Sequence, residues 1–260
     1  GFSMLSIISP AKKLDFSNKI IQNKATEPLF NTEAFLLANV ASKLSKSELG
    51  QLMSISDNLA KLNYERFQNF KKQPSELETK PAALAFNGDT YVGLQAQAFS
   101  SQDFAFAQDN LRILSGLYGL LRPLDNIQPY RLEMGSTLKN SLGDNLYHYW
   151  GELVSKSLAK ELKKKKSNTI INLASNEYSK VLDQGILDAL IITPQFLEER
   201  EKKFKNISFF SKKARGSMAR FIIQNKIENP LDINAFNLEN YNYNPEISTN
   251  DQPTFTRKVK

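Results

Sequence analysis

The segment LSGLYGLLRPLDNIQPYRLEMG, Leu114–Gly135, is the stretch of sequence that most constrains the fold. It holds three glycines, two prolines, two tyrosines, two arginines and two acids within 22 residues. Its apolar residues follow neither the period of a helix nor the alternation of a strand. Such a segment is typical of an active-site loop, a phosphate clamp or a structural corner. Because the glycines permit tight turns and the prolines fix φ beside Arg122 and Tyr130, it predicts a rigid corner that holds arginines.

Arginine is unevenly distributed along the chain. Only eight of the 34 basic residues are arginine, and five of them lie in two short segments, 112–131 and 215–220. A guanidinium group suits planar, bidentate recognition of phosphate or carboxylate better than an ammonium group does. Two interpretations stay open. Arg122 and Arg131 bind an anion from outside, or they pair internally with Asp125 and Glu133.

The composition indicates a folded protein. Of its 260 residues, 41% are hydrophobic and 17 are phenylalanine, which is enough to build a core. No run of about 18 apolar residues is present, and no secretory signal is apparent. We therefore expect no membrane partner. Residues 1–3 resemble the remnant of a cloning tag.

Metal and thiol chemistry are poorly supported by the sequence. The chain has no cysteine and a single histidine, His148, so disulfides, thiolate nucleophiles and cysteine-ligated metals are excluded. One histidine cannot form a multi-histidine metal site, and no EF-hand spacing occurs. We expect no cofactor and no tightly bound metal, and we expect His148 to pack rather than to catalyse.

The net charge of +7 is concentrated in one part of the chain. Between Lys156 and Arg220 there are 15 Lys and Arg against 7 Asp and Glu, a local balance of +8. This excess favours an anionic partner, with nucleic acid as the first candidate. The plainer interpretation is a solvated surface, and we favour it for Lys160–Lys166, which reads as the end of an exposed helix.

Short β-rich runs alternate with helical patterns along the chain. The runs that predict strands are Leu5–Ile8, Ala83–Phe86, Thr169–Leu173, Leu190–Ile192, the alternating Lys203–Phe210, and Thr254–Lys260 as a last edge strand. Helices are predicted at Thr32–Leu44, from a capping box at Ser45–Glu48 to about Met53, from an N-cap at Ser56 onward, and at Ser101–Leu114, Tyr147–Leu162 and Ala214–Ile227. These elements predict an α+β fold, a single domain over residues 4–260 with a mixed central β-sheet flanked by helices.

Two of the predicted strands run into polar loops, NGDTYVG and NLASNEYSK. Strand ends are where proteins of this class gather site residues. Asp89 and Glu177 could act as an acid and a base, or as metal ligands, if the loops converge. Capping of a turn explains Asn87 and Asp89 equally well. The possible small-ligand site comprises Asn87, Asp89, Asn172, Glu177 and Tyr178.

The segment KKARGSMARF, Lys212–Phe221, gives the strongest signal for an anion site. It is predicted to open a helix, where cations oppose the helix dipole unless an anion is bound. Arg215 and Arg220 lie within the same segment. The segment SPAKKLD, which carries Lys12 after the first strand, is a weaker case of the same kind.

Residues of about 45–70 resemble a helix-hairpin-helix. That motif usually has glycine, a hydrophobic residue and glycine, then alanine, and presents backbone N–H groups to a DNA phosphate. Here Ser54 and Ser56 replace both glycines, with Ala60 and Lys61 in the following helix. Serine can cap the helix and donate to phosphate, but it tolerates positive φ less well. The alternative is a plain helical hairpin.

Six segments together resemble the YaaA family of peroxide-stress proteins, in the order of that family from Met4 to about Phe221. They are LSIISPAKKLDF, LMSISDNLAKLN, AFNGDTYVGLQA, LRILSGLYGLLRPLDNIQPYRLEMG, INLASNEYSKV and KKARGSMARFII. The resemblance implies a bacterial, cytoplasmic protein that limits hydrogen peroxide damage by keeping free iron low. It also implies DNA binding, an α+β fold, a basic cleft and a helix-hairpin-helix element.

Carried onto this chain, the resemblance implies that double-stranded or branched DNA is bound through phosphate contacts. The residues expected to make them are Lys12, Ser54, Ser56, Lys61, Arg122, Arg131, Lys212, Lys213, Arg215 and Arg220. The alternative is an enzyme acting on a nucleotide or another phosphorylated small molecule in the same cleft. That alternative requires Asp89 and Glu177 within reach of the arginines, because catalytic groups must contact the bound substrate.

Overall fold

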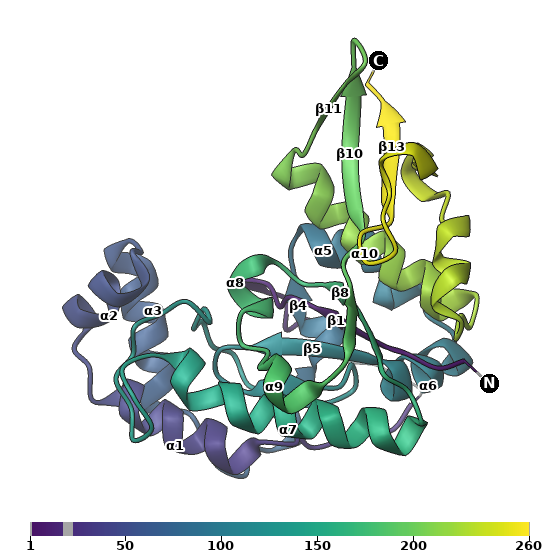
Figure 1. Cartoon of the computed structure of the whole chain (residues 1–260). Helices are drawn as coiled ribbons and strands as arrows, with labels where there is room; N and C mark the ends of the chain where they lie inside the picture. Colours follow the sequence, from purple (N-terminus) through teal and green to yellow (C-terminus); the bar gives the residue numbers. More distant parts are fainter. Residues whose placement is uncertain (1, 18–22, 260) are drawn as a thin grey trace.

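A five-stranded mixed sheet forms the centre of the molecule. The computed structural model describes residues 2–17 and 23–259, and Figure 1 shows the arrangement of its helices and strands. The strand order is β6-β5-β1-β8-β9. The bounds are β1 Leu5–Ile8, β5 Leu111–Ser115, β6 Gly119–Leu121, β8 Thr169–Leu173 and β9 Leu190–Ile192. The α+β class and the mixed sheet are as predicted, and the predicted bounds of β1, β8 and β9 are confirmed.

The three inner strands are largely apolar because both faces of the sheet are covered. β1 pairs in parallel with β5 and with β8, and every residue of these three strands is buried. Parallel strands covered on both faces read as continuous hydrophobic runs rather than as alternating ones. The helix α7, Leu146–Lys165, lies on one face, and α10, Ser208–Gln224, lies on the other. β6 closes one edge in antiparallel pairing with β5.

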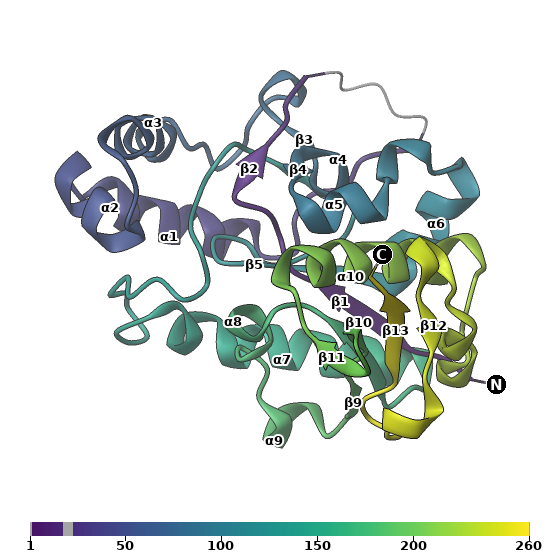
Figure 2. The ribbon, with the colours of Figure 1, turned by 90° about the horizontal axis from the view of Figure 1, so that it is seen from above.

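A second sheet of four strands projects from the body, as Figure 1 shows, and Figure 2 shows its strands from above. Its order is β11-β10-β13-β12, with β10 at Gln195–Arg200, β11 at Lys203–Lys205, β12 at Asn242–Tyr243 and β13 at Thr254–Lys258. β13 pairs in parallel with β10 and antiparallel with β12. The last strand is therefore inside this sheet, and its prediction as an edge strand was wrong. Its buried Phe255 stacks on Phe196 at a centroid distance of 5.5 Å.

The remaining elements are short ladders and helices. Two antiparallel ladders join β2, Lys13–Leu14, to β4, Phe86–Asn87, and β3, Lys80–Pro81, to β7, Asn126–Ile127. The other helices are α1 Asn31–Ser42, α2 Lys46–Met53, α3 Asp57–Gln68, α4 Ala82–Ala85, α5 Asp89–Leu94, α6 Ser101–Asn110, α8 Asn176–Ser179 and α9 Gln184–Leu187. Short turns of tighter helix include η4, Leu238–Asn240.

Three predicted elements were wrong in type or in extent. The predicted strand at 83–86 is the helix α4, followed by the two-residue strand β4. The predicted helix at 101–114 ends at Asn110, because the next five residues enter the central sheet beside β1. The alternating run at 203–210 is a strand only to Lys205, and α10 already begins at Ser208. Apolar runs this short fit either element, and the tertiary partner decides between them.

The segment Leu114–Gly135 forms the predicted corner. β5 and β6 make a hairpin, and Gly119 adopts a φ of 71° with Trp150 packed against it. The indole N–H of Trp150 donates to the carbonyl of Gly116 at 2.7 Å. The hydroxyl of Tyr130 hydrogen-bonds that of Ser115 at 2.6 Å. Glycine is required at 119 because this left-handed conformation is costly for other residues and a side chain there would collide with the indole.

The helices α2 and α3 form a hairpin at one end of the molecule, with the predicted caps. Ser45 and Glu48 complete a capping box for α2, and Ser56 caps α3 by accepting the N–H of Leu59. Ser54 ends α2 in the left-handed region, at φ 52°. The first serine thus occupies a conformation that favours glycine, whereas the second, at φ −64°, does not need one.

Candidate functional site

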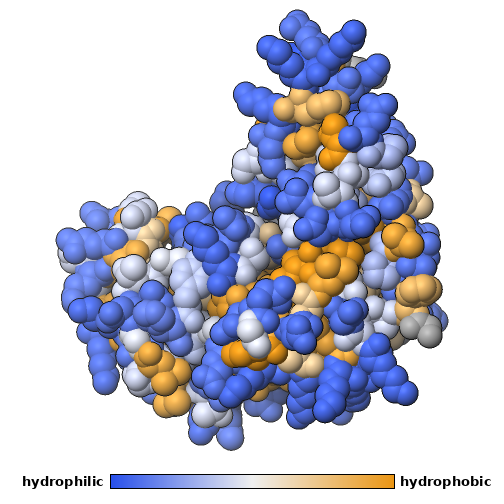
Figure 3. All heavy atoms as spheres, viewed as in Figure 1, coloured by the Kyte–Doolittle hydropathy of each residue, from blue (hydrophilic) through white to orange (hydrophobic). Residues whose placement is uncertain are grey.

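A cavity of about 560 Å³ lies where the loops after β1 and β8 meet the start of α5 and the first half of α10. The elements that form it lie at the base of a hollow between the α2–α3 hairpin and the projecting sheet, as Figures 1 and 3 show together. The lining brings together side chains from four separate segments. Seven of the predicted site residues are among them, namely Lys12, Asn87, Asp89, Glu177, Tyr178, Lys212 and Arg215.

Arg215 is the most informative residue of this cavity. Its guanidinium forms no hydrogen bond or ion pair with any residue that the structure describes. Burial lowers the pKa of the Arg215 guanidinium below its usual range, although the group remains a cation at neutral pH. Most buried cations are paired, because desolvating a charge without a partner is costly. An anionic ligand would supply the missing partner.

Three lysines add positive charge to the same lining. Lys12 and Lys13 come from the segment between β1 and β2, and Lys212 from the first turns of α10. The side chain of Lys12 is 65% exposed, and its Nζ lies 3.9 Å from Oε1 of Glu133. The sequence placed Lys212 and Arg215 at the start of a helix, and this was wrong, because α10 already begins at Ser208 and both residues lie inside it. Their place beside the cavity follows from the helix face they occupy.

The cavity also holds two carboxylates and a buried tyrosine. Asp89, in the first turn of α5, has no hydrogen-bond partner within the described part of the chain. Glu177, in α8, accepts the backbone N–H of Gly135 at 2.9 Å. Burial raises the pKa of the Tyr178 hydroxyl well above its usual value, so this phenol stays neutral. Acidic, basic and phenolic groups thus meet in one place.

The crossing of α5 and α10 brings Asp89 to the same cavity as Lys212 and Arg215. Glycines allow it, because a Cβ on Gly216 would lie 1.7 Å from the carbonyl oxygen of Thr90, and one on Gly93 only 2.0 Å from that of Lys213. Arg220 then donates from Nε to the carbonyl of Gly93 at 2.9 Å. Arg220, predicted as a phosphate contact, is thus used to hold the two helices together.

Other predicted residues do not line the cavity. Arg122 pairs with the fully buried Asp125 at 2.9 Å, and Arg131 pairs with Glu133 at 2.9 Å. The structure thus shows the internal pairing that the sequence left as one of two possibilities. Lys213 forms an ion pair with Glu239 at 3.4 Å. The side-chain oxygen of Asn172 accepts the N–H of Ala174. The last three predicted residues, Ser54, Ser56 and Lys61, lie on the α2–α3 hairpin.

Some residues of the lining escaped the sequence reasoning. Ser9 and Ser175 join the ends of β1 and β8, since the Ser175 N–H donates to the Ser9 hydroxyl at 2.8 Å. Thr90 also lines the cavity. All three lie inside the polar loops that the sequence had already marked as site loops. The available signal was therefore the position just after a strand, and not the residue type.

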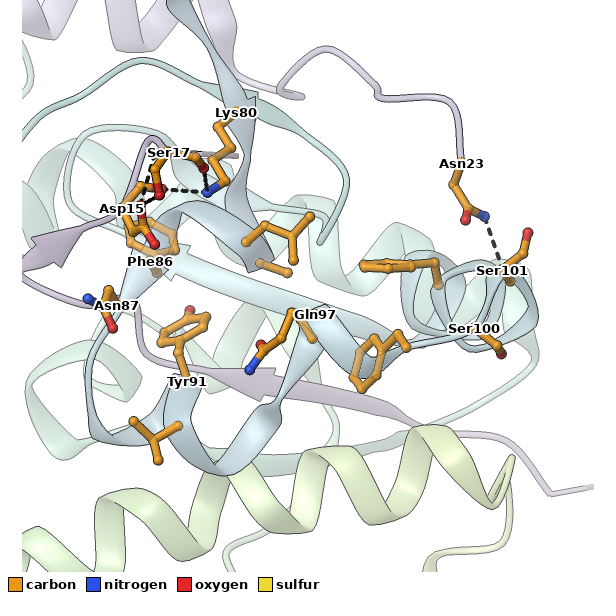
Figure 4. A pocket seen from close by; sticks show the side chains of 16 residues that line it. Asp15, Ser17, Asn23, Lys80, Phe86, Asn87, Tyr91, Gln97, Ser100 and Ser101 are labelled. Carbon is orange, nitrogen blue, oxygen red and sulfur yellow. Dashed lines mark hydrogen bonds between the residues drawn. The ribbon is translucent and has the colours of Figure 1, made fainter. Parts of the chain in front are cut away.

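A larger cavity of about 670 Å³, drawn in Figure 4, adjoins the first through Asn87. Its charged lining residues among those described, Asp15 and Lys80, are already engaged. The Lys80 ammonium donates to the backbone carbonyls of Asp15 and Ser17, and the Ser17 hydroxyl and N–H lower the pKa of the Asp15 carboxyl. We therefore assign no ligand-binding role to this cavity.

Within residues 2–17 and 23–259, no group of three or more His, Asp or Glu side chains could hold a metal ion. The same residues contain no helix that is long and apolar enough to span a membrane.

Fold and site together define an α+β protein with a cavity of mixed charge at the carboxyl ends of its central parallel strands. Residues 4–247 match the family described as peroxide stress protein YaaA, and the chain belongs to that family. Among curated relatives, a UPF0246 protein from Colwellia psychrerythraea is 49% identical over 98% of this chain and 99% of its own length. Others, from Saccharophagus degradans and Roseobacter denitrificans, are 47% and 48% identical over 98% of this chain, and over 100% and 98% of their own lengths.

Proposed function

We propose that this chain binds DNA through its phosphate backbone, in the hollow above the cavity, as part of the bacterial response to hydrogen peroxide. The observation that carries the proposal is Arg215, a largely buried guanidinium without a partner among the described residues. Lys12, Lys13 and Lys212 line the same cavity. Such a cluster of cations suits an anion, and the anionic groups of a nucleic acid are its phosphates.

The α2–α3 hairpin provides a second point of contact in this proposal. Lys61 is exposed one turn into α3, behind the serine cap at Ser56. The hairpin stands on the opposite side of the hollow from the projecting sheet (Figures 1 and 3). A duplex lying across the hollow would meet phosphate-binding groups at the bottom of the hollow and on one of its walls. This geometry supports binding that depends little on base sequence.

Titration of a short DNA duplex at increasing salt tests the proposal. The affinity should fall linearly on a log–log plot, because bound phosphates release counterions. Arg215→Gln should weaken binding and reduce the magnitude of the salt slope by about one. Lys61→Gln should have a smaller effect of the same kind. An affinity that does not change with salt would contradict phosphate binding.

A matched control comes from the end of α7. Lys164 is exposed in the last turn of that helix and does not line the cavity. Lys164→Gln removes the same unit of charge and should leave the affinity within about twofold of the unmodified chain. Equal losses in Arg215→Gln and Lys164→Gln would mean that net charge, and not the cavity, governs binding.

A second function is favoured by one specific observation. Asp89 and Glu177 line the same cavity as Arg215, and the enzyme hypothesis required this convergence. An enzyme acting on a nucleotide or another phosphorylated small molecule would use the carboxylates as acid and base. Incubation with nucleoside phosphates, followed by chromatography, should then reveal a product whose formation is lost in Asp89→Asn and in Glu177→Gln. Tight binding without any turnover would speak against an enzyme.

A further inference from the structure

Phosphate binding by itself does not account for the acidic half of the cavity. Asp89 and Glu177 face the same space as four cations, and they would repel a bare phosphate. Asp89 has no hydrogen-bond partner among the described residues, whereas Glu177 uses one carboxylate oxygen on the Gly135 N–H. Carboxylates are acceptors only, so a ligand that fits both halves must carry hydrogen-bond donors as well as a phosphate.

The size of the cavity points in the same direction. At about 560 Å³ it lies in the range of sites that enclose a single small organic molecule. A double helix is too wide to enter, and one phosphate group would fill only a small part of the space. The lining also includes the apolar surfaces of Pro10 and Ala11 and the largely buried ring of Tyr178. Such surfaces suit a flat, weakly polar ring.

We infer that the cavity receives one unpaired nucleotide of the bound DNA, with its phosphate at Arg215 and its base edge at Asp89 and Glu177. The inference rests on the proposed DNA-binding function and specifies its ligand. The base edges of unpaired nucleotides carry amino and imino N–H groups, which are the donors that carboxylates accept from. Extracting a nucleotide from the helix costs least where it is already mismatched. The chain therefore favours DNA that contains an unpaired position.

Two duplexes of one sequence, differing by a single mismatched base pair, test the inference. The unmodified chain should bind the mismatched duplex roughly tenfold more tightly, because part of the cost of unpairing is already met. In Asp89→Asn and in Glu177→Gln this ratio should fall towards one. A 2-aminopurine at the mismatch should change its emission on binding to the unmodified chain and not on binding to Asp89→Asn.

The control is Asp188→Asn, which neutralises an exposed carboxylate away from the cavity. Asp188 has a φ of 46°, a conformation that asparagine adopts readily. This variant should keep the full preference for the mismatched duplex. A preference lost equally in Asp188→Asn would overturn the inference, since it would reflect general charge and not the cavity.

The outcomes separate this inference from the proposed function. Salt-dependent binding with equal affinity for both duplexes overturns the inference and leaves phosphate binding in place. Absence of binding to either duplex overturns both. A third arm uses free deoxyadenosine monophosphate as the probe. If it binds in an Asp89-dependent manner while the two duplexes bind equally, the ligand is a free nucleotide, and the strand-borne nucleotide is refuted.

Discussion

At the scale of single residues, the protein contains two arginines in opposite situations. Arg122 is paired with the buried Asp125, and the same carboxylate accepts the Thr26 hydroxyl at 2.6 Å. Arg215 is largely buried with no partner among the described residues. The first arginine belongs to the structure of the corner, and the second is left for a ligand. Stability measurements distinguish these two situations.

Replacing Arg215 should stabilise the free protein while weakening its binding. Arg215→Gln removes a desolvated charge, and we expect the free energy of unfolding to rise by about 1 kcal/mol. For a chain of this size, that corresponds to a melting temperature higher by roughly 2–4 °C. Thermal unfolding followed by circular dichroism measures it. A lower melting temperature would mean that Arg215 contributes to the fold.

Replacing Arg122 should have the reverse effect. Arg122→Gln leaves Asp125 buried without its cation, and we expect a destabilisation of about 3 kcal/mol. Because Arg122 contacts no part of the cavity lining, the affinity of the remaining folded protein for DNA should not change. Urea unfolding and a binding titration on the same variant provide both values. A loss of affinity with normal stability would mean that Arg122 belongs to the DNA-binding surface.

At the scale of elements, the crossing of α5 and α10 is the feature on which the cavity depends. A methyl group at Gly216 would collide with the Thr90 carbonyl, and backbone atoms cannot move aside without separating the helices. We expect Gly216→Ala to destabilise the protein by about 3 kcal/mol or more. Chemical denaturation measures this change.

Gly50 in α2 supplies the matched control. A Cβ there would make only ordinary contacts, the nearest at 3.6 Å from the Cβ of Ala60. Gly50→Ala should therefore stabilise the protein by up to about 1 kcal/mol, through helix propensity. Similar effects of the two alanine substitutions would contradict the tight crossing.

The turn between α2 and α3 gives a prediction of its own. Ser54 lies at φ 52° and ψ 52°, so Ser54→Gly should relieve strain and stabilise the hairpin by up to about 1 kcal/mol. Ser56 is an N-cap with extended backbone, so Ser56→Ala should cost about 1 kcal/mol. Urea unfolding of both variants tests this. A destabilising Ser54→Gly would show that the serine side chain is needed there.

At the scale of the whole molecule, buried tyrosines make stability sensitive to alkaline pH. Burial raises the pKa of Tyr91, Tyr118, Tyr130 and Tyr178 above the ordinary value near 10. Above that value the unfolded chain releases these protons first. Each tyrosine therefore contributes stability that is complete below about pH 10 and is lost as the pH rises, by about 1.4 kcal/mol per pH unit.

The measurement is urea unfolding between pH 8 and pH 11.5, with phenolate absorbance recorded in parallel. Unfolding and phenolate formation should occur together, because the buried hydroxyls ionise only when exposed. The hydroxyl of Tyr118, for example, accepts the backbone N–H of Gln128 at 3.0 Å in the folded state. Stability that stays constant across this range would contradict the burial of these groups.

What the sequence determined by itself was local. The continuous apolar runs of β1 and β8 and the serine caps of α2 and α3 were read correctly, because each depends on neighbours within a few residues. The polar loops after those strands also indicated where the site lies. They did so because strands in parallel end at the same edge of a sheet.

Only the tertiary structure decided which charges are available to a ligand. The sequence left open whether Arg122 pairs with the nearby Asp125 or binds an anion; the structure forms that pair, whereas no described residue reaches Arg215. The same holds for residues 111–115, which became a central strand because β1 offered them an edge. The strands β1 and β5 lie about a hundred residues apart in the chain. Pairing at such a distance depends on the packing of the whole molecule, and no local pattern specifies it.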